Sequence, residues 1–197
     1  MSTPFTETKA ALREEIYARL KAMPRGHRTV ESAQICARLA ATELWQNART
    51  VLLFAPMPDE PDIWPLLALA LAAGKTLALP RFDRAARNYV TALVQNTEND
   101  FVAGHFGIRE PAAACPVLPL NRLDLALVPG VAFDLHGGRL GRGKGYYDRL
   151  LASVPGATCG VAFDEQIVAA VPVEPHDIRL NHILTPTRWQ TASPARF

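Results

Sequence analysis

Short apolar runs that alternate with helical patterns constrain the fold of this chain more than any other feature. Residues 50–55 (TVLLFA), 123–128 (LDLALV) and 158–163 (TCGVAF) are runs in which nearly every side chain is apolar. Such runs are typical of strands that are covered on both faces. Their alternation with helices predicts an α/β fold with a mainly parallel sheet and helices on both faces, a three-layer, Rossmann-like arrangement. In such folds, ligands bind beyond the carboxyl ends of the strands.

Helical spacing of apolar residues predicts the helices around these strands. Leu12, Ile16 and Leu20 recur at this spacing and predict a helix over residues 4–22. The remaining expected elements are a helix over 28–46 with Val30, Ile35, Leu39 and Leu44 inward, a helix from Asp62 to Ala73 ended by Gly74, strands over 76–79 and 89–94, and a helix over 146–153. We expect residues 95–122 to be irregular and the tail after Pro186 to be frayed.

Length and composition are those of an ordinary globular domain. With 197 residues, of which 49% are hydrophobic and 20% charged, we expect residues 1–197 to form one domain and a monomer. The net charge of +2 is too small to predict nucleic-acid or membrane binding. Three widely spaced cysteines (Cys36, Cys115 and Cys159), an N-terminus unlike a signal peptide and apolar runs too short for a bilayer lead us to expect a cytoplasmic protein.

A basic, glycine-rich segment follows the second of the apolar runs. Residues 137–145 (GGRLGRGKG) hold five of the twelve glycines and three positive charges, with no acidic residue. Glycine allows positive φ and a close backbone approach, so successive N–H groups can surround an anion. The helix expected after it adds a partial positive charge worth only about 0.3–1 kcal/mol, so Arg142 and Lys144 must supply most of the attraction. The segment therefore predicts a site for nucleotide phosphates.

The same segment also fits G-x-x-x-x-G-K, the pattern of a P-loop, from Gly138 to Lys144. Gly145 stands where a P-loop has the Ser or Thr that holds magnesium, so we reject the P-loop and retain the phosphate site. Asp148 can supply a carboxylate instead, since magnesium takes one or two of them together with phosphate oxygens. A mobile RNA-binding loop is the alternative, and the ordered elements expected on both sides argue against it.

Two stretches, residues 129–134 (PGVAFD) and 138–148 (GRLGRGKGYYD), resemble the signature of the 5-formyltetrahydrofolate cyclo-ligase family, also called methenyltetrahydrofolate synthetases. Weaker agreement extends over nearly the whole chain. The resemblance implies an enzyme that converts 5-formyltetrahydrofolate to 5,10-methenyltetrahydrofolate with ATP and Mg²⁺. The formyl oxygen would attack the γ-phosphate, and N10 would then close the ring with release of phosphate.

The resemblance also implies a role for individual residues. ATP would contact Lys9, Arg13, Arg139, Leu140, Gly141, Arg142, Gly143, Lys144, Gly145, Tyr146 and Tyr147. The reduced folate would contact Met57, Glu60, Asp62, Arg142, Lys144 and Tyr146, and Asp148 and Asp177 would hold the magnesium ion. Catalysis would depend on Arg142, Lys144 and Tyr147. Pro61, Ile63 and the segment 89–94 depart from the family's usual residues near the folate.

Structural roles remain open for several of these residues. Lys9 and Arg13 could form a basic pair on a solvated helix face, and Glu60 and Asp62 could be turn and cap residues. Asp177 could be a plain turn residue. For the whole protein, the alternatives are a phosphosugar or acyl-CoA enzyme on a related scaffold and a non-catalytic folate- or RNA-binding module. The spacing of His136, His176 and His182 fits no zinc signature.

Overall fold

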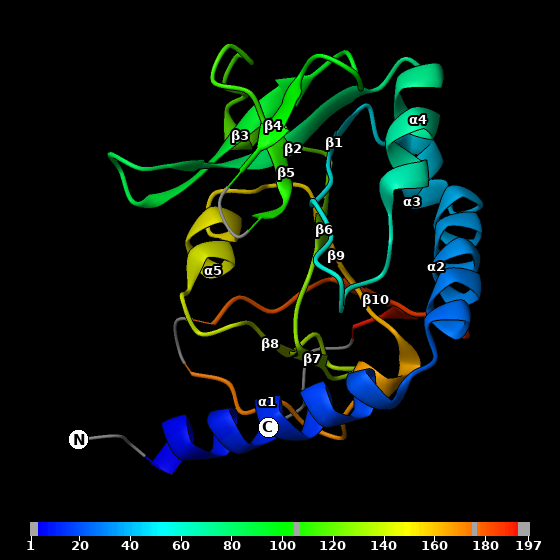
Figure 1. The fold of residues 1–197 in the computed structure, drawn as a ribbon, viewed down its shortest axis with the longest axis vertical. Helices are drawn as coiled ribbons and strands as arrows, with labels where there is room; N and C mark the ends of the chain where they lie inside the picture. The colour runs from blue at the N-terminus through cyan, green and yellow to red at the C-terminus, as the bar shows by residue number, and fades with distance from the viewer. Residues whose placement is uncertain (1–3, 105–106, 175–176, 193–197) are drawn as a thin grey trace.

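The structure, a computed structural model, describes residues 4–104, 107–174 and 177–192, and side chains from residue 8 onward. Its centre is a seven-stranded sheet in the order β11-β10-β9-β6-β1-β2-β3 (Figure 1). Neighbouring strands are parallel from β10 to β2, and each edge strand is antiparallel to its neighbour. The predicted mainly parallel sheet is confirmed. Its strands are β1 (Thr50–Leu52), β2 (Thr76–Asp83), β3 (Asn88–Val94), β6 (Leu125–Val128), β9 (Ala157–Val161), β10 (His182–Leu184) and β11 (Trp189–Thr191).

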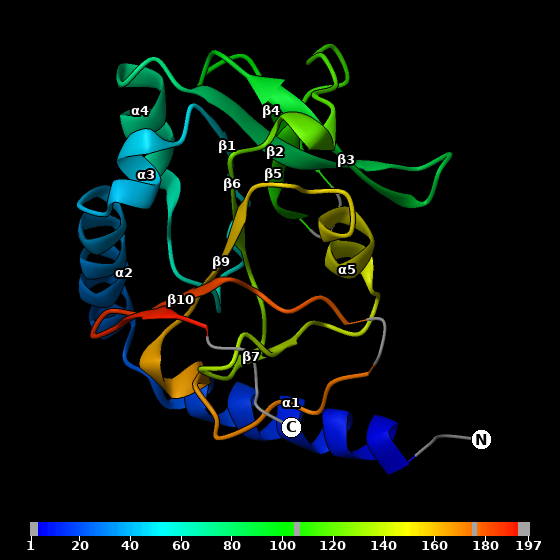
Figure 2. The same cartoon turned by 180° about the vertical axis from the view of Figure 1, so that it is seen from behind.

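Helices cover both faces of this sheet. α2 (Arg25–Ala40), α3 (Glu43–Asn47) and α4 (Trp64–Ala72) lie along one face, and α5 (Tyr146–Leu151) lies on the other (Figures 1 and 2). α1 (Pro4–Ala22) crosses the end of the sheet where the parallel strands finish. There it contacts the 3₁₀ turn η3 (Asp164–Gln166) and β7 (Ala132–Phe133), which forms a small hairpin with β8 (Arg139–Leu140). Helix α1 therefore covers the carboxyl edge of the sheet.

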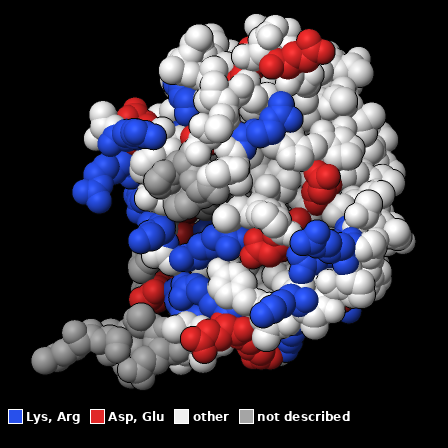
Figure 3. Space-filling view, viewed as in Figure 1, with Lys and Arg blue, Asp and Glu red and all other residues white. Residues whose placement is uncertain are grey.

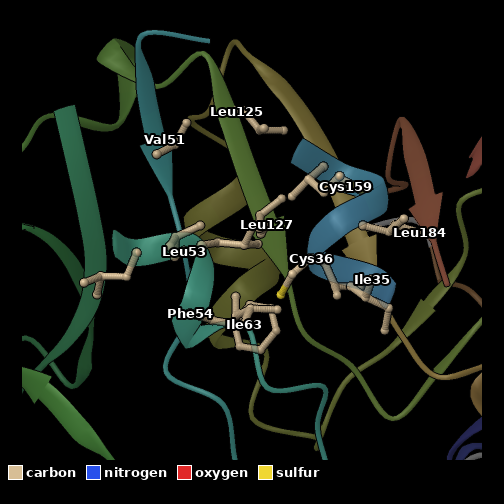
Figure 4. Close-up of a cluster of buried hydrophobic side chains, with 14 of the residues drawn as sticks. Ile35, Cys36, Val51, Leu53, Phe54, Ile63, Leu125, Leu127, Cys159 and Leu184 are labelled. Carbon is tan, nitrogen blue, oxygen red and sulfur yellow. The ribbon is translucent and has the colours of Figure 1, made fainter. Parts of the chain in front are cut away.

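Successive residues of the central strands point to opposite faces, and both faces are buried. In β6, Leu125 and Leu127 belong to the cluster that contains Ile35 of α2 (Figure 4). Ala126, between them, belongs to a second cluster that contains Leu150 of α5. Burial on both faces explains why these strands read as continuous apolar runs rather than as alternating ones. No helix in the described part of the chain has the length and apolar character needed to cross a membrane.

The expected helix over 28–46 is wrong in its bounds and in one inward residue. The chain forms two helices, because Thr42 breaks the first and caps α3 by accepting a hydrogen bond from the Trp45 N–H at 3.1 Å. Val30 is 55% exposed rather than inward. At about 100° per residue it lies roughly 140° around the helix from Ile35, which marks the buried face with Leu39.

Residues 95–122 are not irregular throughout, and the chain is not frayed directly after Pro186. β4 (Phe101–Ala103) and β5 (Arg109–Pro111) form an antiparallel pair that packs on β2 and β3, and η2 (Leu120–Arg122) precedes β6. β10 and β11 pair up to Thr191, and residues 193–197 lie outside the described part. Three-residue strands carry little periodic signal, so their pairing decides their structure.

Candidate active site

A cavity of about 490 Å³ opens at the carboxyl edge of the sheet, and the glycine-rich segment forms one of its walls. This volume suits a small-molecule ligand. All of the residues assigned to the site from the sequence line this cavity except Asp62. The structure therefore brings together segments from α1, from the loop after β1, from residues 139–148 and from the stretch before β10. The cavity also has lining residues that the sequence reasoning missed, namely Ala55, Tyr89, Ile108, Pro129, Gly130 and Glu174.

Asp62 lies away from the cavity and is exposed. Its Oδ1 accepts a hydrogen bond from the Trp64 N–H at 3.0 Å, and its own N–H donates to Ser32 Oγ at 3.0 Å. The carboxylate thus fixes the start of α4, one residue before the N-cap position that Ile63 occupies. This arrangement corresponds to the turn and cap role that the sequence left open.

A buried aspartate fixes the conformation of the glycine-rich segment. Asp134, 3% exposed, accepts hydrogen bonds from the N–H groups of His136, Gly138 and Val171 at 2.8–2.9 Å. A side chain at Gly138 would collide with this carboxylate. Further along, Gly143 and Gly145 have φ of 91° and 63°, which glycine adopts without strain. Asp134 belongs to the motif PGVAFD, but the sequence did not indicate that it anchors the segment.

At one end of the cavity, Lys9 links α1 to the loop before β10. Its Nζ lies 2.7 Å from both Glu174 Oε2 and Asp177 Oδ2. Burial lowers the pKa of Lys9, but the hydrogen bonds to Asp177 and Glu174 outweigh burial, so the pKa is raised. Arg13, one turn further along α1, donates from Nε to the Gly141 carbonyl at 2.8 Å. Lys9 therefore contacts the loop before β10, and Arg13 contacts the glycine-rich loop, so the two residues do more than form a solvated pair.

The first residue of β8 carries a buried cation. The Arg139 side chain is 3% exposed, and its Nη2 lies 2.7 Å from Asp148 Oδ1 of α5. Its guanidinium also lies 5.8 Å from the centre of the Tyr147 ring. Arg139 thus ties the hairpin β7–β8 to the first turn of α5, and the glycine-rich loop is stretched between them.

Arg142 crosses the cavity to the loop after β1. Its Nη2 donates to Asp59 Oδ1 at 2.6 Å and to Glu60 Oε1 at 3.1 Å. Burial raises the pKa of Glu60, although the Met57 N–H and the Arg142 charge both act to lower it. The pKa of Arg142 is raised because hydrogen bonding to Asp59 and the charges of Glu60 and Asp59 outweigh its burial. Lys144, by contrast, is exposed and has no hydrogen-bond or ion-pair partner among the described residues.

Cationic and acidic side chains therefore alternate around this cavity. In Figure 3, Lys and Arg groups lie beside Asp and Glu groups over α1 and the loop before α5. Among the cations that line the cavity, Lys9, Arg139 and Arg142 are already paired with carboxylates. Within the described residues Arg13 donates only to a backbone carbonyl, and Lys144 has no partner. An added anion can therefore be bound by Arg13, by Lys144, by the N–H groups of the loop, or by cations that leave their present carboxylate partners.

Another part of the cavity wall is aromatic. The ring of Tyr89 lies edge-on to those of Phe82 and Tyr146, with centroids 5.7 and 5.2 Å apart, and 6.1 Å from that of Tyr147. Burial raises the pKa of Tyr89 to about 12, and the pKa of Tyr147 is also raised by burial. Both phenols are therefore neutral at physiological pH and can donate hydrogen bonds. This end of the cavity suits a flat, partly apolar ring.

The candidate magnesium ligands, Asp148 and Asp177, both line the cavity. Each already accepts from a cation, Arg139 and Lys9 respectively. Within the described residues, no group of three or more His, Cys, Asp or Glu side chains could hold a metal by itself. Magnesium needs no such cage when phosphate oxygens complete its shell, and the carboxylate oxygens are of the type it prefers. The residues therefore fit a magnesium ion that arrives with a nucleotide.

Of the three histidines weighed as metal ligands, the two that the structure describes lie in different elements. His136 lies in the turn between β7 and β8, and His182 begins β10, where its ring stacks on Trp189 at 5.0 Å. His176 lies outside the described residues.

Together, the fold and the site define an α/β protein with a basic, glycine-rich loop and an aromatic pocket at the carboxyl edge of a mainly parallel sheet. A family model described as the 5-formyltetrahydrofolate cyclo-ligase family matches residues 5–186. The chain belongs to the 5-formyltetrahydrofolate cyclo-ligase family. The family predicted from the sequence motifs is confirmed, and with it the enzyme class, a ligase of folate one-carbon metabolism.

Curated relatives match over nearly their whole length. The 5-formyltetrahydrofolate cyclo-ligase of Mycolicibacterium smegmatis is 32% identical over 186 residues, which cover 92% of this chain and 95% of the relative. The enzyme of the same name from Escherichia coli K12 is 35% identical over 172 residues, covering 82% and 94%.

Solved structures agree with the fold. The NMR structure of 5,10-methenyltetrahydrofolate synthetase from Aquifex aeolicus superposes with a TM-score of 0.85 at 31% identity, covering 96% of this chain and 95% of that one. The synthetase from Mycoplasma pneumoniae has a TM-score of 0.72 over 90% of this chain, and at 20% identity it supports the fold alone.

Proposed function

We propose that this protein converts 5-formyltetrahydrofolate to 5,10-methenyltetrahydrofolate at the expense of ATP, releasing ADP and phosphate. One observation carries the proposal: in a chain of this family, the glycine-rich loop, its cations and an aromatic wall line the same cavity. The triphosphate would lie on residues 139–147, and the reduced pterin would lie against the aromatic wall. The nucleotide and the formyl group would then meet between the two.

The chemistry needs an activated oxygen. A formamide oxygen is a poor leaving group, so the formyl oxygen first attacks the γ-phosphorus and ADP departs. N10 then adds to the formyl carbon and loses its proton, and the C–O bond breaks with phosphate as the leaving group, which carries away the former formyl oxygen. Catalysis of phosphoryl transfer depends mainly on positioning and on neutralising charge.

Lys144, Arg142 and Tyr147 would serve this transfer. Because the Lys144 ammonium has no partner among the residues that the structure describes, it is available to a γ-phosphate without loss of an ion pair there. Arg142 would add its charge after leaving Asp59 and Glu60. Tyr147 stays protonated, because burial raises its pKa, and so could donate a hydrogen bond. Fixed donors of this kind stabilise charge that develops in the transition state.

Metal and folate contacts follow from the same cavity. Asp148 and Asp177 would hold Mg²⁺, which neutralises charge on the phosphate oxygens when it is bound. Met57, Glu60 and Tyr146 would contact the folate, whose pterin ring offers N–H donors to the Glu60 carboxylate. We assign Asp62 to the start of α4 instead, since it lies away from the cavity.

The test is an absorbance assay for the methenyl product with purified protein, 5-formyltetrahydrofolate and Mg·ATP. We expect a signal that requires ATP and is accompanied by ADP. Activity on a phosphosugar or acyl-CoA that ignores ATP would favour the first alternative function, and folate or RNA binding without ADP release would favour a non-catalytic module. Protein that binds both substrates yet gives no ATP-dependent signal contradicts the proposal.

Lys144→Ala is the sharpest single variant for this assay. We expect kcat to fall about 100- to 1000-fold, the usual cost of losing one transition-state donor. The melting temperature should stay the same, because Lys144 is exposed and makes no hydrogen bond or ion pair within the described structure. Lys21→Ala, at the exposed end of α1 and outside the cavity, is the matched control. An unchanged kcat for Lys144→Ala would remove this residue from the mechanism.

A further inference from the structure

Asp59 has no part in the reaction outlined so far, yet it holds one of the cations assigned to the phosphates. Its Oδ1 lies 2.6 Å from Arg142 Nη2, and the same nitrogen lies 3.1 Å from Glu60 Oε1. Arg142 and Glu60 line the cavity, whereas Asp59 stands beside it. One guanidinium therefore joins the glycine-rich loop to two neighbouring acids in the loop after β1.

A third segment tethers the same guanidinium. Arg142 Nη1 lies 3.4 Å from the Tyr17 hydroxyl of α1, and its guanidinium lies 5.8 Å from the centre of the Tyr17 ring. Arg142 is thus fixed by residues from two other segments while it retains 34% side-chain exposure. A partly exposed, well-tethered cation can be drawn away by a stronger anion such as a triphosphate.

Glu60 depends on this contact more than Asp59 does. Its side chain is 5% exposed, against 29% for Asp59. The other partner of Glu60 is the Met57 N–H, 2.9 Å from Oε2. If Arg142 moved to a phosphate, Glu60 would remain as a buried carboxylate with its Oε1 unpaired, which is unfavourable unless a new donor arrives.

We infer that Asp59 is a positioning residue that holds Arg142 in a resting contact with Glu60, and that nucleotide and folate bind cooperatively because each takes one member of this pair. The inference rests on the proposed function. The triphosphate takes the guanidinium of Arg142, and the N–H donors of the pterin take the carboxylate of Glu60. The ligand that binds first breaks the Arg142–Glu60 contact. The second ligand then binds without the cost of breaking that contact.

This exchange predicts the size and symmetry of the effect. Each ligand should lower the dissociation constant of the other by the same factor, because coupling between two sites is reciprocal. A factor of about 10 is typical. Asp59 affects nucleotide binding alone, since its contact with Arg142 opposes the move of Arg142 to the phosphates whether or not folate is present. Removing its charge should tighten nucleotide binding by about 1.5- to 5-fold, the range for exposed ion pairs. Folate binding to the free protein should stay unchanged, because Arg142 can keep its contact with Asp59 when the pterin takes Glu60.

The experiment measures dissociation constants by calorimetry for 5-formyltetrahydrofolate and for a non-hydrolysable ATP analogue with Mg²⁺, each alone and with the other at saturation. We expect about 10-fold mutual tightening for the unmodified protein. Asp59→Asn should bind the analogue more tightly, and this gain should vanish in an Arg142→Gln background. Glu98→Gln, at an exposed acid outside the cavity, should leave all of the constants unchanged.

Two results would overturn the inference. Equal constants with and without the second ligand would show that the pair does not couple the sites. A gain from Asp59→Asn that persists with Arg142→Gln would show plain repulsion of phosphate rather than positioning of Arg142. Failure of the proposed function is distinguishable, because it appears as a ligand that does not bind to the unmodified protein, or as the absence of ATP-dependent methenyl product in the absorbance assay.

Discussion

Replacement of Asp148 by Asn should destabilise the fold, because this carboxylate is the charged partner of a buried guanidinium. The Arg139 side chain is 3% exposed and lies 2.7 Å from Asp148 through Nη2. In the part of the chain that the structure describes, its Nε has no hydrogen-bond partner, and its Nη1 reaches only the Pro129 carbonyl, at 3.5 Å. Asn keeps the shape of Asp148 but leaves the guanidinium buried without a counter-ion.

The size of the loss follows from this burial. Breaking a buried ion pair from one side costs about 3–5 kcal/mol, and the 19% exposure of the Asp148 side chain places the value near the lower end. Arginine cannot shed its proton, so changing the pH offers no relief. A loss of about 3 kcal/mol in a chain of this length lowers the melting temperature by about 6–12 °C.

Urea unfolding followed by circular dichroism measures this loss. A chelator in the buffer ensures that a change in metal binding cannot contribute. The double variant Arg139→Met with Asp148→Asn removes the buried charge as well, and it should recover most of the lost stability. The reasoning is wrong if Asp148→Asn unfolds within about 1 kcal/mol of the unmodified protein, or if the double variant is no more stable than the single one.

Two further predictions concern stability. The pKa of Glu60 is raised above its ordinary value of 4.5, so the proton on Glu60 adds stability that is fully present below pH 4.5 and is lost as pH rises through the folded pKa. Urea titrations at several pH values measure the unfolding free energy. As pH rises from 4.5, this free energy should fall less for Glu60→Gln than for the unmodified protein, and an equal fall in both would contradict the prediction. Gly145 has φ 63°, and Gly145→Ala should cost about 1–2 kcal/mol, whereas Gly26→Ala, in α2 with open space around it, should not destabilise. Equal urea midpoints for these two variants would argue against strain at Gly145.

Much of the fold could be predicted because its central strands are buried on both faces. Continuous apolar runs mark β1, β6 and β9 without any knowledge of their partners. The hairpin β4–β5 and the edge pair β10–β11 gave no such signal, since strands of three residues gain their stability from pairing. Thr42 could have indicated the break between α2 and α3, because threonine is a favoured N-cap residue.

The candidate site was predictable in its residues but not in its pairings. Every residue that spacing and resemblance assigned to the site lines the cavity, with the exception of Asp62. They could not show that Lys9 pairs with Asp177, or that Arg142 reaches Asp59, because these partners are brought together only by the sheet. Tyr89 was flagged only as a departure from the family, and its place in the aromatic wall became visible from ring contacts.

The central claim is that the backbone of the glycine-rich loop cradles a triphosphate. Amide chemical shifts recorded while Mg²⁺ and a non-hydrolysable ATP analogue are added test this most directly. We expect saturable shifts concentrated at the N–H groups of Gly141, Gly143 and Gly145 and their neighbours. Saturable binding with shifts elsewhere and none in residues 139–147, or no binding at all, would contradict the account.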